Sequence, residues 1–453
     1  MEQMQHLIDS AASWLWGWPM IILLIGTHIF LTLRLRLPQR KILTAIKLSF
    51  QKEEKESGDI SPFGSLATSL AATIGTGNII GVATAVSLGG PGAVFWCWVT
   101  GVLGIATKYA EGVLAVKYRV KTENGEMIGG PMYALERGLN MRWTAVLFCI
   151  FTAIAAFGIG NTVQANSIAT LLNETLSVPT YATGAVIALL VALVNFFGIK
   201  GIARVCVILV PFMALFYLLG CAIILCMNAQ YLGTALKAII ESAFSSQAAS
   251  GGFAGSTIMI AARYGIARGL FSNESGLGSA PIIAAAARTR NPVRQALISS
   301  SATFWDTVVI CAITGLTLVS SIIAHPDIDC AQGAVLTNSA FSKIPYAGEA
   351  ILTVGIFTFA FSTLLSWSYY GEKAIEYLGG KKCTKYYRIA WVIVVFIGSV
   401  MNLGLVWGIS DCMNALMAIP NLVALLLLSG IVAKETKKYL WSGNLDEYDD
   451  NKQ

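Results

Sequence analysis

The chain has 453 residues, of which 55% are hydrophobic and only 12% are charged, and its mean hydropathy is +0.67. Soluble proteins have about 25% charged residues, so this composition excludes a soluble globular protein and predicts an all-α integral membrane protein with many spans. The formal net charge of +6 does not require nucleic acid, because basic residues in a membrane protein report its orientation. The cysteines form no CxxC pair and the three histidines are scattered, so neither disulfides nor a metal cluster is expected.

A first span is expected at residues 15–33, and a strongly basic stretch follows it. The bases of this stretch are Arg34, Arg36, Arg40, Lys41, Lys47, Lys52 and Lys55. Because positive charge collects on the cytoplasmic side of a membrane protein, the N-terminus is predicted to lie outside the cell.

Residues 61–92 are apolar enough to form the second span, but the centre of this stretch makes a poor helix. Residues 73–78 read TIGTGN, and glycine and polar residues weaken a helix. A broken helix leaves N–H and C=O groups unpaired, which a bilayer tolerates only where they line a cavity. The freed N–H groups could then bind a carboxylate, and the freed carbonyls a cation. Alternatively, the glycines form a face for close packing against another helix.

Nine further spans of about 20 residues are expected along the rest of the chain. They are placed at 92–116, 146–171, 183–199, 205–226, 253–287, 297–323, 348–370, 389–407 and 412–433. Together with the first two they give about eleven spans. With the N-terminus outside, the basic loops, which include 200–204 and 381–388, fall on the cytoplasmic side together with the C-terminus.

The span at 253–287 contains a second interruption. Residues 269–279 read GLFSNESGLGS, which places glycines, serines, Asn273 and Glu274 between apolar flanks. Broken helices in the second and seventh spans indicate an inverted repeat of two five-span halves with a site at the membrane midplane. The chain is therefore divided into an extra helix with a cytoplasmic loop (1–60), a first repeat (61–228), a second repeat (229–434) and a cytoplasmic tail (435–453).

Polar side chains inside the spans are candidates for the site. Ser362 and Thr363 supply adjacent hydroxyls that suit a cation with neutral oxygen ligands, although such residues in membrane helices also bond to their own helix carbonyls. Trp367 lies four residues after Thr363 and shares its helical face. Gln164 has a donor and an acceptor with which to orient a substrate, or it makes an interhelical hydrogen bond.

Ionisable residues inside spans are functional candidates by default. Lys108 and Glu111 are expected to pair near the inner end of their span. Glu274 is not expected to form such a pair, because it lies within the second interruption. Its carboxyl group makes proton coupling an alternative to sodium coupling. The other ionisable residues lie near span ends, where we expect them to form ion pairs or to extend their charged groups to the membrane surface. They are Arg263, Arg268, Asp306 and Asp411.

Several stretches resemble the alanine/glycine:cation symporter family, also called sodium:alanine symporters. They are ATIGTGNIIGVATA (72–85), GGPGAVFWCWV (89–99), TKYAEGVLAVKYR (107–119), GGPMYAL (129–135), GLFSNESGLGSAP (269–281), STLLSWSYYGE (362–372) and DCMNALMAIPNL (411–422). The resemblance covers about residues 60–430. Cys97, Ser275 and Gly64 depart from the family pattern, in which Met, Ala and a larger polar residue are usual, and these departures bear on substrate selectivity rather than on the family.

The resemblance implies a leucine-transporter-type fold, an amino-acid substrate and sodium coupling, with Asn78 as a sodium ligand. The substrate site that it implies comprises Thr73, Gly77, Asn78, Gln164, Phe271, Ser272, Gly276, Thr363 and Trp367.

The residues themselves suggest how such a substrate is held. The N–H groups around Gly75 and Gly77 would bind its carboxylate, and carbonyls near Phe271 and Ser272, with Gln164, would accept hydrogen bonds from its ammonium. Phe271 and Trp367 would leave room for a hydrogen or a methyl side chain. Sodium is assigned to Asn78, Ser362 and Thr363.

These observations predict a symporter that imports alanine or glycine with Na⁺ by alternating access in the bacterial cytoplasmic (inner) membrane. No GxxxxGK[ST] or HExxH motif is present, so neither nucleotide-driven transport nor an intramembrane enzyme is expected. A proton-coupled symporter and a channel remain the alternatives. The expected partners are the amino acid, Na⁺ and the lipid bilayer, without nucleic acid, and no cofactor other than the coupling ion is expected.

Overall fold

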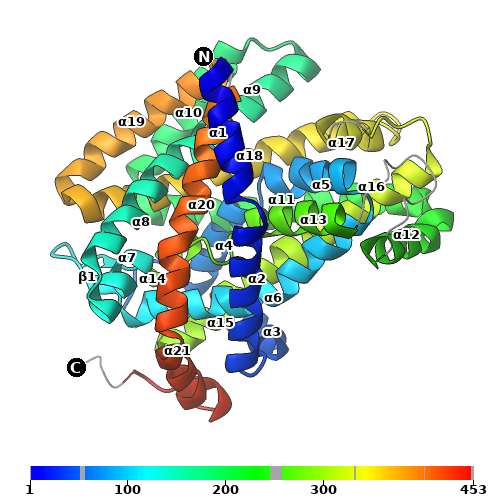
Figure 1. Cartoon of the computed structure of the whole chain (residues 1–453). Coiled ribbons are helices and arrows are strands. Elements are labelled where there is room, and N and C mark those ends of the chain that lie inside the picture. The colour runs from blue at the N-terminus through cyan, green and yellow to red at the C-terminus, as the bar shows by residue number, and fades with distance from the viewer. Residues whose placement is uncertain (1, 52–56, 245–257, 331–332, 402–403, 450–453) are drawn as a thin grey trace.

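The computed structural model describes residues 2–51, 57–244, 258–330, 333–401 and 404–449. Nearly all of these residues are helical, and β1 (Val120–Lys121) and β2 (Met127–Ile128) form a short antiparallel hairpin. The N-terminus and the C-terminal tail lie at opposite ends of the molecule (Figure 1). Lys52, Lys55 and residues 253–257 of the expected seventh span lie outside the described residues.

The helices of the first half of the chain include three π-helical stretches, η2, η3 and η4. Their bounds are α1 (Glu2–Leu15), α2 (Trp18–Arg34), η1 (Pro38–Lys41), α3 (Ile42–Ser49), α4 (Pro62–Thr73), η2 (Gly77–Gly81), α5 (Val82–Gly89), α6 (Gly92–Lys117), α7 (Pro131–Tyr133), η3 (Ala134–Gly138), α8 (Arg142–Ala155), η4 (Ala156–Thr162), α9 (Val163–Leu176), α10 (Thr180–Phe196) and α11 (Gly198–Met227).

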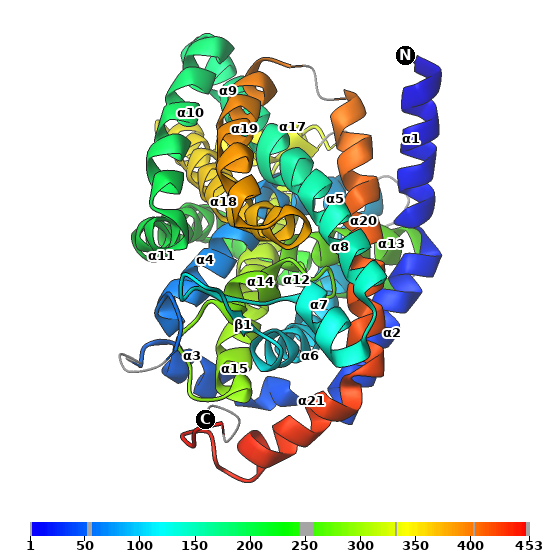
Figure 2. The ribbon, with the colours of Figure 1, turned by 90° about the vertical axis from the view of Figure 1, so that its left-hand side faces the viewer.

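The second half contains two more π-helical stretches, η6 in the middle of a long apolar helix and η7 at the end of this half. The bounds are η5 (Ala229–Tyr231), α12 (Leu232–Phe244), α13 (Ile258–Asn273), α14 (Ala280–Ala285), α15 (Pro292–Thr303), η6 (Phe304–Cys311), α16 (Ala312–Ala324), α17 (Gly333–Phe341), α18 (Gly348–Gly379), α19 (Lys381–Val400), α20 (Gly404–Leu427), α21 (Ser429–Thr436) and η7 (Lys437–Trp441). Helices α1, α2 and α20 form one flank of the molecule (Figure 2).

Within the described residues, eight helices are long and apolar enough to cross a membrane, or nine if the bent pair α4 and η2–α5 is one span. The apolar helix α10 has only 17 residues, and the second interrupted helix, α13 with α14, is not among the nine. The chain is therefore a multi-pass membrane protein, and the exact count of eleven stays a prediction.

Several span boundaries differ from the prediction: α18 ends at Gly379 rather than near 370, and α20 begins at Gly404 rather than near 412. Helix α11 begins at Gly198 and α19 at Lys381, so the stretches 200–204 and 381–388 are helical and not loops. Long basic side chains can reach the membrane interface from a helical turn, so a basic cluster does not have to end a helix.

The first predicted break is confirmed. Ser61 caps α4 by accepting a hydrogen bond from the N–H of Gly64 at 3.0 Å. The helix ends after Thr73, because Ile74 has a ψ angle of 89°, and the helix that resumes at Gly77 is bent by 53° from α4. Glycine at 75 and 77 lowers the free-energy cost of this interruption.

The second predicted break is confirmed as well. After α13 ends at Asn273, Glu274, Gly276 and Gly278 all take positive φ angles of 54°, 93° and 87°. Glycine adopts such angles without strain, whereas glutamate does so rarely. Helix α14 then begins with Pro281 in its first turn, where a missing N–H costs nothing.

The two interrupted helices are tied together on the side of the C-terminal tail. Ile60, before α4, forms a parallel bridge with Ala287, after α14. The guanidinium of Arg119 donates to the carbonyl oxygens of Ser57, Ala285 and Ala287 at 3.2, 3.1 and 2.8 Å. Any separation of the two helices on this side must therefore break the hydrogen bonds of Arg119.

The β1–β2 hairpin is attached to the junction of α18 and α19 through Glu126. Its Oε2 accepts hydrogen bonds from Lys373 at 3.0 Å and Lys381 at 2.6 Å. Burial alone would raise the pKa of the Glu126 carboxyl, but the two ammonium groups outweigh burial and lower its pKa to about 2.

Candidate functional site

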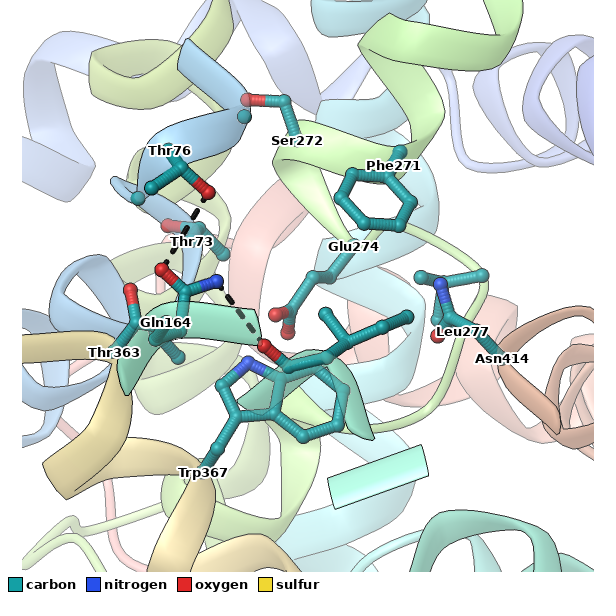
Figure 3. A pocket seen from close by; sticks show the side chains of 14 residues that line it. Thr73, Thr76, Gln164, Phe271, Ser272, Glu274, Leu277, Thr363, Trp367 and Asn414 are labelled. Atoms are coloured by element: carbon teal, nitrogen blue, oxygen red, sulfur yellow. Dashed lines mark hydrogen bonds between the residues drawn. The ribbon is translucent and has the colours of Figure 1, made fainter. Parts of the chain in front are cut away.

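A small cavity lies between the two interrupted helices, α18 and the η4–α9 stretch (Figure 3). It has about 20 Å³ of free volume, which is room for about one water molecule. The residues that line it are Ala72, Thr73, Gly75, Thr76, Gly77, Ile159, Gln164, Phe271, Ser272, Glu274, Leu277, Thr363, Trp367 and Asn414. An amino acid can therefore be accommodated only if the surrounding side chains or helices move.

The first break presents two N–H groups at the cavity wall. Within the described part of the chain, the N–H groups of Thr76 and Gly77 have no hydrogen-bond partner. The N–H of Gly75, in contrast, donates to Oδ1 of Asn78 at 2.9 Å. Free N–H groups at the start of a helix carry partial positive charge, so this wall suits a carboxylate.

The second break presents carbonyl groups to the same cavity. At the end of α13, the carbonyl of Asn273 accepts from Nζ of Lys108 at 2.8 Å. The carbonyls of Phe271 and Ser272 have no donor within the described residues. These groups form the negative end of a helix dipole, so this wall suits an ammonium group.

Glu111 binds the backbone of the second break. Its Oε1 accepts hydrogen bonds from the N–H groups of Gly276 at 3.0 Å and Gly278 at 3.2 Å and from Nδ2 of Asn421 at 2.7 Å. The expected pairing of Glu111 with Lys108 is wrong, because Lys108 reaches the carbonyl of Asn273 and no ion pair joins the two among the described residues. Each of the two side chains instead bonds to backbone groups that the break has freed.

Asp306 is the most important residue that sequence reasoning misplaced. It lies in the π-helical stretch η6, in the middle of its span rather than near the end. Its carboxylate accepts from Nδ2 of Asn78 at 2.7 Å, Oγ of Ser272 at 3.0 Å and Oγ1 of Thr307 at 2.7 Å. One carboxylate thus joins the two breaks, and its rarity inside a span was the signal that could have identified it.

The two predicted hydroxyls of α18 turn toward the first break. Ser362 Oγ and Thr363 Oγ1 both donate to the carbonyl of Ala71, at 3.2 and 3.1 Å, and to the carbonyl of Phe359, at 2.9 and 3.0 Å. A Cβ atom on Gly75 would lie 2.8 Å from Thr363 Oγ1. Four neutral oxygens that converge in this way fit the ligand preference of a hard cation such as Na⁺.

Trp367 and Phe271 are the aromatic walls of the cavity. Trp367 packs directly on Gly160 of η4, where a Cβ atom would lie only 2.3 Å from the tryptophan Cβ. Glu274 points its carboxylate toward the indole of Trp367 (Figure 3), and Oγ of Ser279 donates to this carboxylate at 2.6 Å. Gln164 faces the cavity from α9 and accepts from Oγ1 of Thr76 at 3.4 Å.

The structure brings most of the predicted substrate residues together. Those that line the cavity are Thr73, Gly75, Gly77, Gln164, Phe271, Ser272, Thr363 and Trp367, whereas Asn78 and Gly276 lie behind its wall. The predicted sodium ligands form two groups, because Asn78 bonds to Asp306 and the pair Ser362 and Thr363 bonds to Ala71. Thr76 and Asn414 also line the cavity and were not predicted, whereas Glu274, which lines it as well, was expected only as a candidate for proton coupling.

Comparison with known proteins places the sequence among symporters. The sequence model of the sodium:alanine symporter family matches residues 1–452. The chain is 52% identical to the sodium/alanine symporter AgcS of Methanococcus maripaludis over 441 residues, 96% of each chain. It is 34% identical to the probable sodium/glutamine symporter GlnT of Bacillus subtilis over 445 residues, 97% of this chain and 91% of that one.

Two solved structures share the fold at low sequence identity. MhsT in complex with L-phenylalanine is 13% identical, with a TM-score of 0.59 over 86% of this chain and 95% of that one. A Na⁺-coupled sialic acid symporter is 12% identical, with a TM-score of 0.53 over 92% and 86%. Both have the leucine-transporter-type fold. With the whole length matched by the family model and by close relatives, the chain belongs to the sodium:alanine symporter family.

Proposed function

We propose that this chain imports small neutral amino acids, alanine or glycine, together with Na⁺ by alternating access. The observation that carries the proposal is that backbone groups without partners occur in both helix breaks that line one cavity. Thr76 and Gly77 offer N–H groups, and Phe271 and Ser272 offer carbonyls. A zwitterionic amino acid supplies the complementary carboxylate and ammonium, whereas a simple anion or cation would satisfy only one wall.

The aromatic rings beside the cavity support a small side chain. Trp367 is pressed between Gly160 and the cavity, and Phe271 closes another wall. Overpacking a rigid site costs about 1–3 kcal/mol, so a leucine-sized substrate should be excluded while hydrogen or methyl is accepted.

Sodium has two candidate positions. The first is formed by the hydroxyls of Ser362 and Thr363 with the carbonyl of Ala71. The second lies at Asp306 and Ser272, which provide a negative charge and a hydroxyl oxygen; here Asn78 turns its Nδ2 toward Asp306, so its amide would have to rotate to offer an oxygen. The first position contains oxygen ligands only, as hard cations prefer. Each position contacts an interrupted helix, so binding of the ion would stabilise the conformation that binds substrate.

We also propose the number and the orientation of the spans in the membrane. We infer eleven spans with the extra helix first, two five-span repeats at 61–228 and 229–434, the N-terminus outside and the C-terminus in the cytoplasm. The basic stretches after α2 and before α15 support this orientation. Release to the cytoplasm would then require the contact between Ile60 and Ala287 to open.

Proton coupling is the second candidate, because Glu274 lines the cavity. A relative from Bacillus subtilis, 33% identical, is described as a putative sodium/proton-dependent alanine carrier protein. The neutral oxygen cluster at Ser362 and Thr363 favours sodium, since a proton needs a titrating group.

Uptake of radiolabelled alanine into proteoliposomes tests the proposal, with Na⁺, Li⁺ or pH gradients imposed separately. We expect saturable accumulation driven by the Na⁺ gradient, its loss in Thr363→Val, and weakened but Na⁺-driven uptake in Glu274→Gln. Thr358→Val is the matched control, because this α18 threonine bonds its own helix at 2.7 Å and does not line the cavity. Accumulation driven by pH alone and abolished in Glu274→Gln would favour proton coupling, and uptake that never exceeds equilibrium would indicate a channel.

A further inference from the structure

An open groove lies on the side of the C-terminal tail, between the stretch that precedes α4, the first turns of α11 and the segment after α14. It has about 480 Å³ of free volume and borders the bridge of Ile60 with Ala287. We call it the basic groove, and its polar lining residues are Asp59, Ser61, Lys200, Arg204 and Arg288.

The three bases of the basic groove are almost without partners. Lys200 and Arg204 are exposed, and their side chains make no hydrogen bond or ion pair with any residue that the structure describes. Arg288 donates its Nε to the carbonyl of Gly58 at 3.4 Å, and within the described residues its Nη atoms have no acceptor. Most of the donors of these bases are therefore available to a ligand.

One carboxylate cannot neutralise the basic groove. Asp59 is the only acidic residue among the described residues that line it. Its Oδ2 already accepts from the N–H of Met127 in the β1–β2 hairpin, at 2.9 Å. Three bases face this single, engaged carboxylate, so the groove keeps an excess of positive charge and suits an anion.

The face of α11 that carries two of these bases becomes apolar directly beyond them. Lys200, Arg204 and Ile208 all line the groove and are four residues apart, which places them on one face of the helix. Lipid tails are as apolar as leucine side chains, so the continuation of this face suits acyl chains. Exposed apolar residues continue it at helical spacing: Ile208, Phe212, Leu215 and Leu219.

We propose that the basic groove binds the phosphate of an acidic membrane phospholipid, with the acyl chains of this lipid along the apolar face of α11. The arginines offer paired N–H donors to the phosphate oxygens, and Lys200 adds a point charge. Basic pockets between membrane helices select acidic headgroups in this way. A soluble phosphate would meet the same bases but leave the apolar face without a partner. Such binding is independent of the transported substrate.

Titration of the purified full-length protein in a neutral detergent tests this site, with native mass spectrometry as the readout. The probes are phosphatidylglycerol and phosphatidylcholine with the same acyl chains. We expect the first phosphatidylglycerol to bind at least about tenfold more tightly, because the choline cation of the other lipid is repelled by the bases.

Removal of the bases should weaken binding of the acidic lipid alone. Each base near a membrane surface contributes about a fivefold increase in affinity, so Lys200→Gln combined with Arg204→Gln should weaken phosphatidylglycerol about 25-fold. Both side chains are exposed and unbonded in the described part of the chain, so the variant should keep its fold. Lys382→Gln is the matched control, because it removes an exposed base from the first turn of α19 that does not line the groove, and it should change neither affinity.

Soluble phosphates identify the source of the ligand. Inorganic phosphate and glycerol 3-phosphate carry the anionic group without acyl chains, so neither should displace phosphatidylglycerol when present at the same concentration. Displacement by either would show a site for soluble phosphate and overturn the lipid assignment. Equal affinities for the two lipids would refute selection by charge, and wild-type affinity for phosphatidylglycerol in the double variant would refute the basic groove as its location.

Discussion

Removal of the Glu111 carboxyl should loosen the second break more than any other single change in the polar interior. Oε1 of Glu111 accepts the N–H groups of Gly276 and Gly278 and the amide of Asn421, and Glu111 itself is 2% exposed. In Glu111→Ala, the two backbone N–H groups lose their acceptor in a buried place. Each such group costs about 1–3 kcal/mol, so the closed form of this segment should lose about 2–6 kcal/mol.

Hydrogen–deuterium exchange of the peptide that contains residues 274–279 measures this loss directly. Since about 1.4 kcal/mol corresponds to a factor of ten, exchange should accelerate by about 30-fold or more in Glu111→Ala. Glu111→Gln is the matched control, because its amide oxygen can still accept the same three hydrogen bonds, and it should keep most of the protection. Wild-type protection in the alanine variant would refute the assignment of Glu111 as the support of the break, whatever the variant transports.

The remaining predictions concern selectivity and pH. Trp367→Leu should admit valine while weakening alanine through lost contacts; competition by valine against alanine uptake checks this, and unchanged selectivity would contradict the role of the ring. Gly160→Ala should push Trp367 into the cavity and lower alanine affinity more than glycine affinity, whereas Gly26→Ala, where a Cβ atom meets nothing within 4 Å, should have no effect. Because the pKa of Glu126 falls from 4.5 to about 2 in the folded protein, its stabilisation of the hairpin is complete at neutral pH and is lost as the pH falls from about 4.5 to about 2. Exchange protection of residues 120–128, corrected for intrinsic rates, should decline over that window in the wild type and stay flat in Glu126→Gln.

The sequence by itself determined where the helices break. Glycine at 75 and 77, and at 276 and 278, cannot sustain a continuous apolar helix, and both interruptions were found where the composition placed them. Most residues around the cavity were predictable for the same reason, because a break in a bilayer needs polar neighbours. Local composition also placed most of the long helices, although α11, α19 and α20 begin earlier and α18 ends later than predicted.

Only the tertiary structure decided which side chain satisfies which freed backbone group. Asp306 meets Asn78 across 228 positions of the chain, and Glu111 meets Gly276 across 165. Neither distance in sequence nor residue type specifies such a pair, since every carboxylate in a span is equally costly until the packed helices give it donors. The breaks are properties of short segments, whereas the pairing of charges depends on how α6, η6 and α13 pack together.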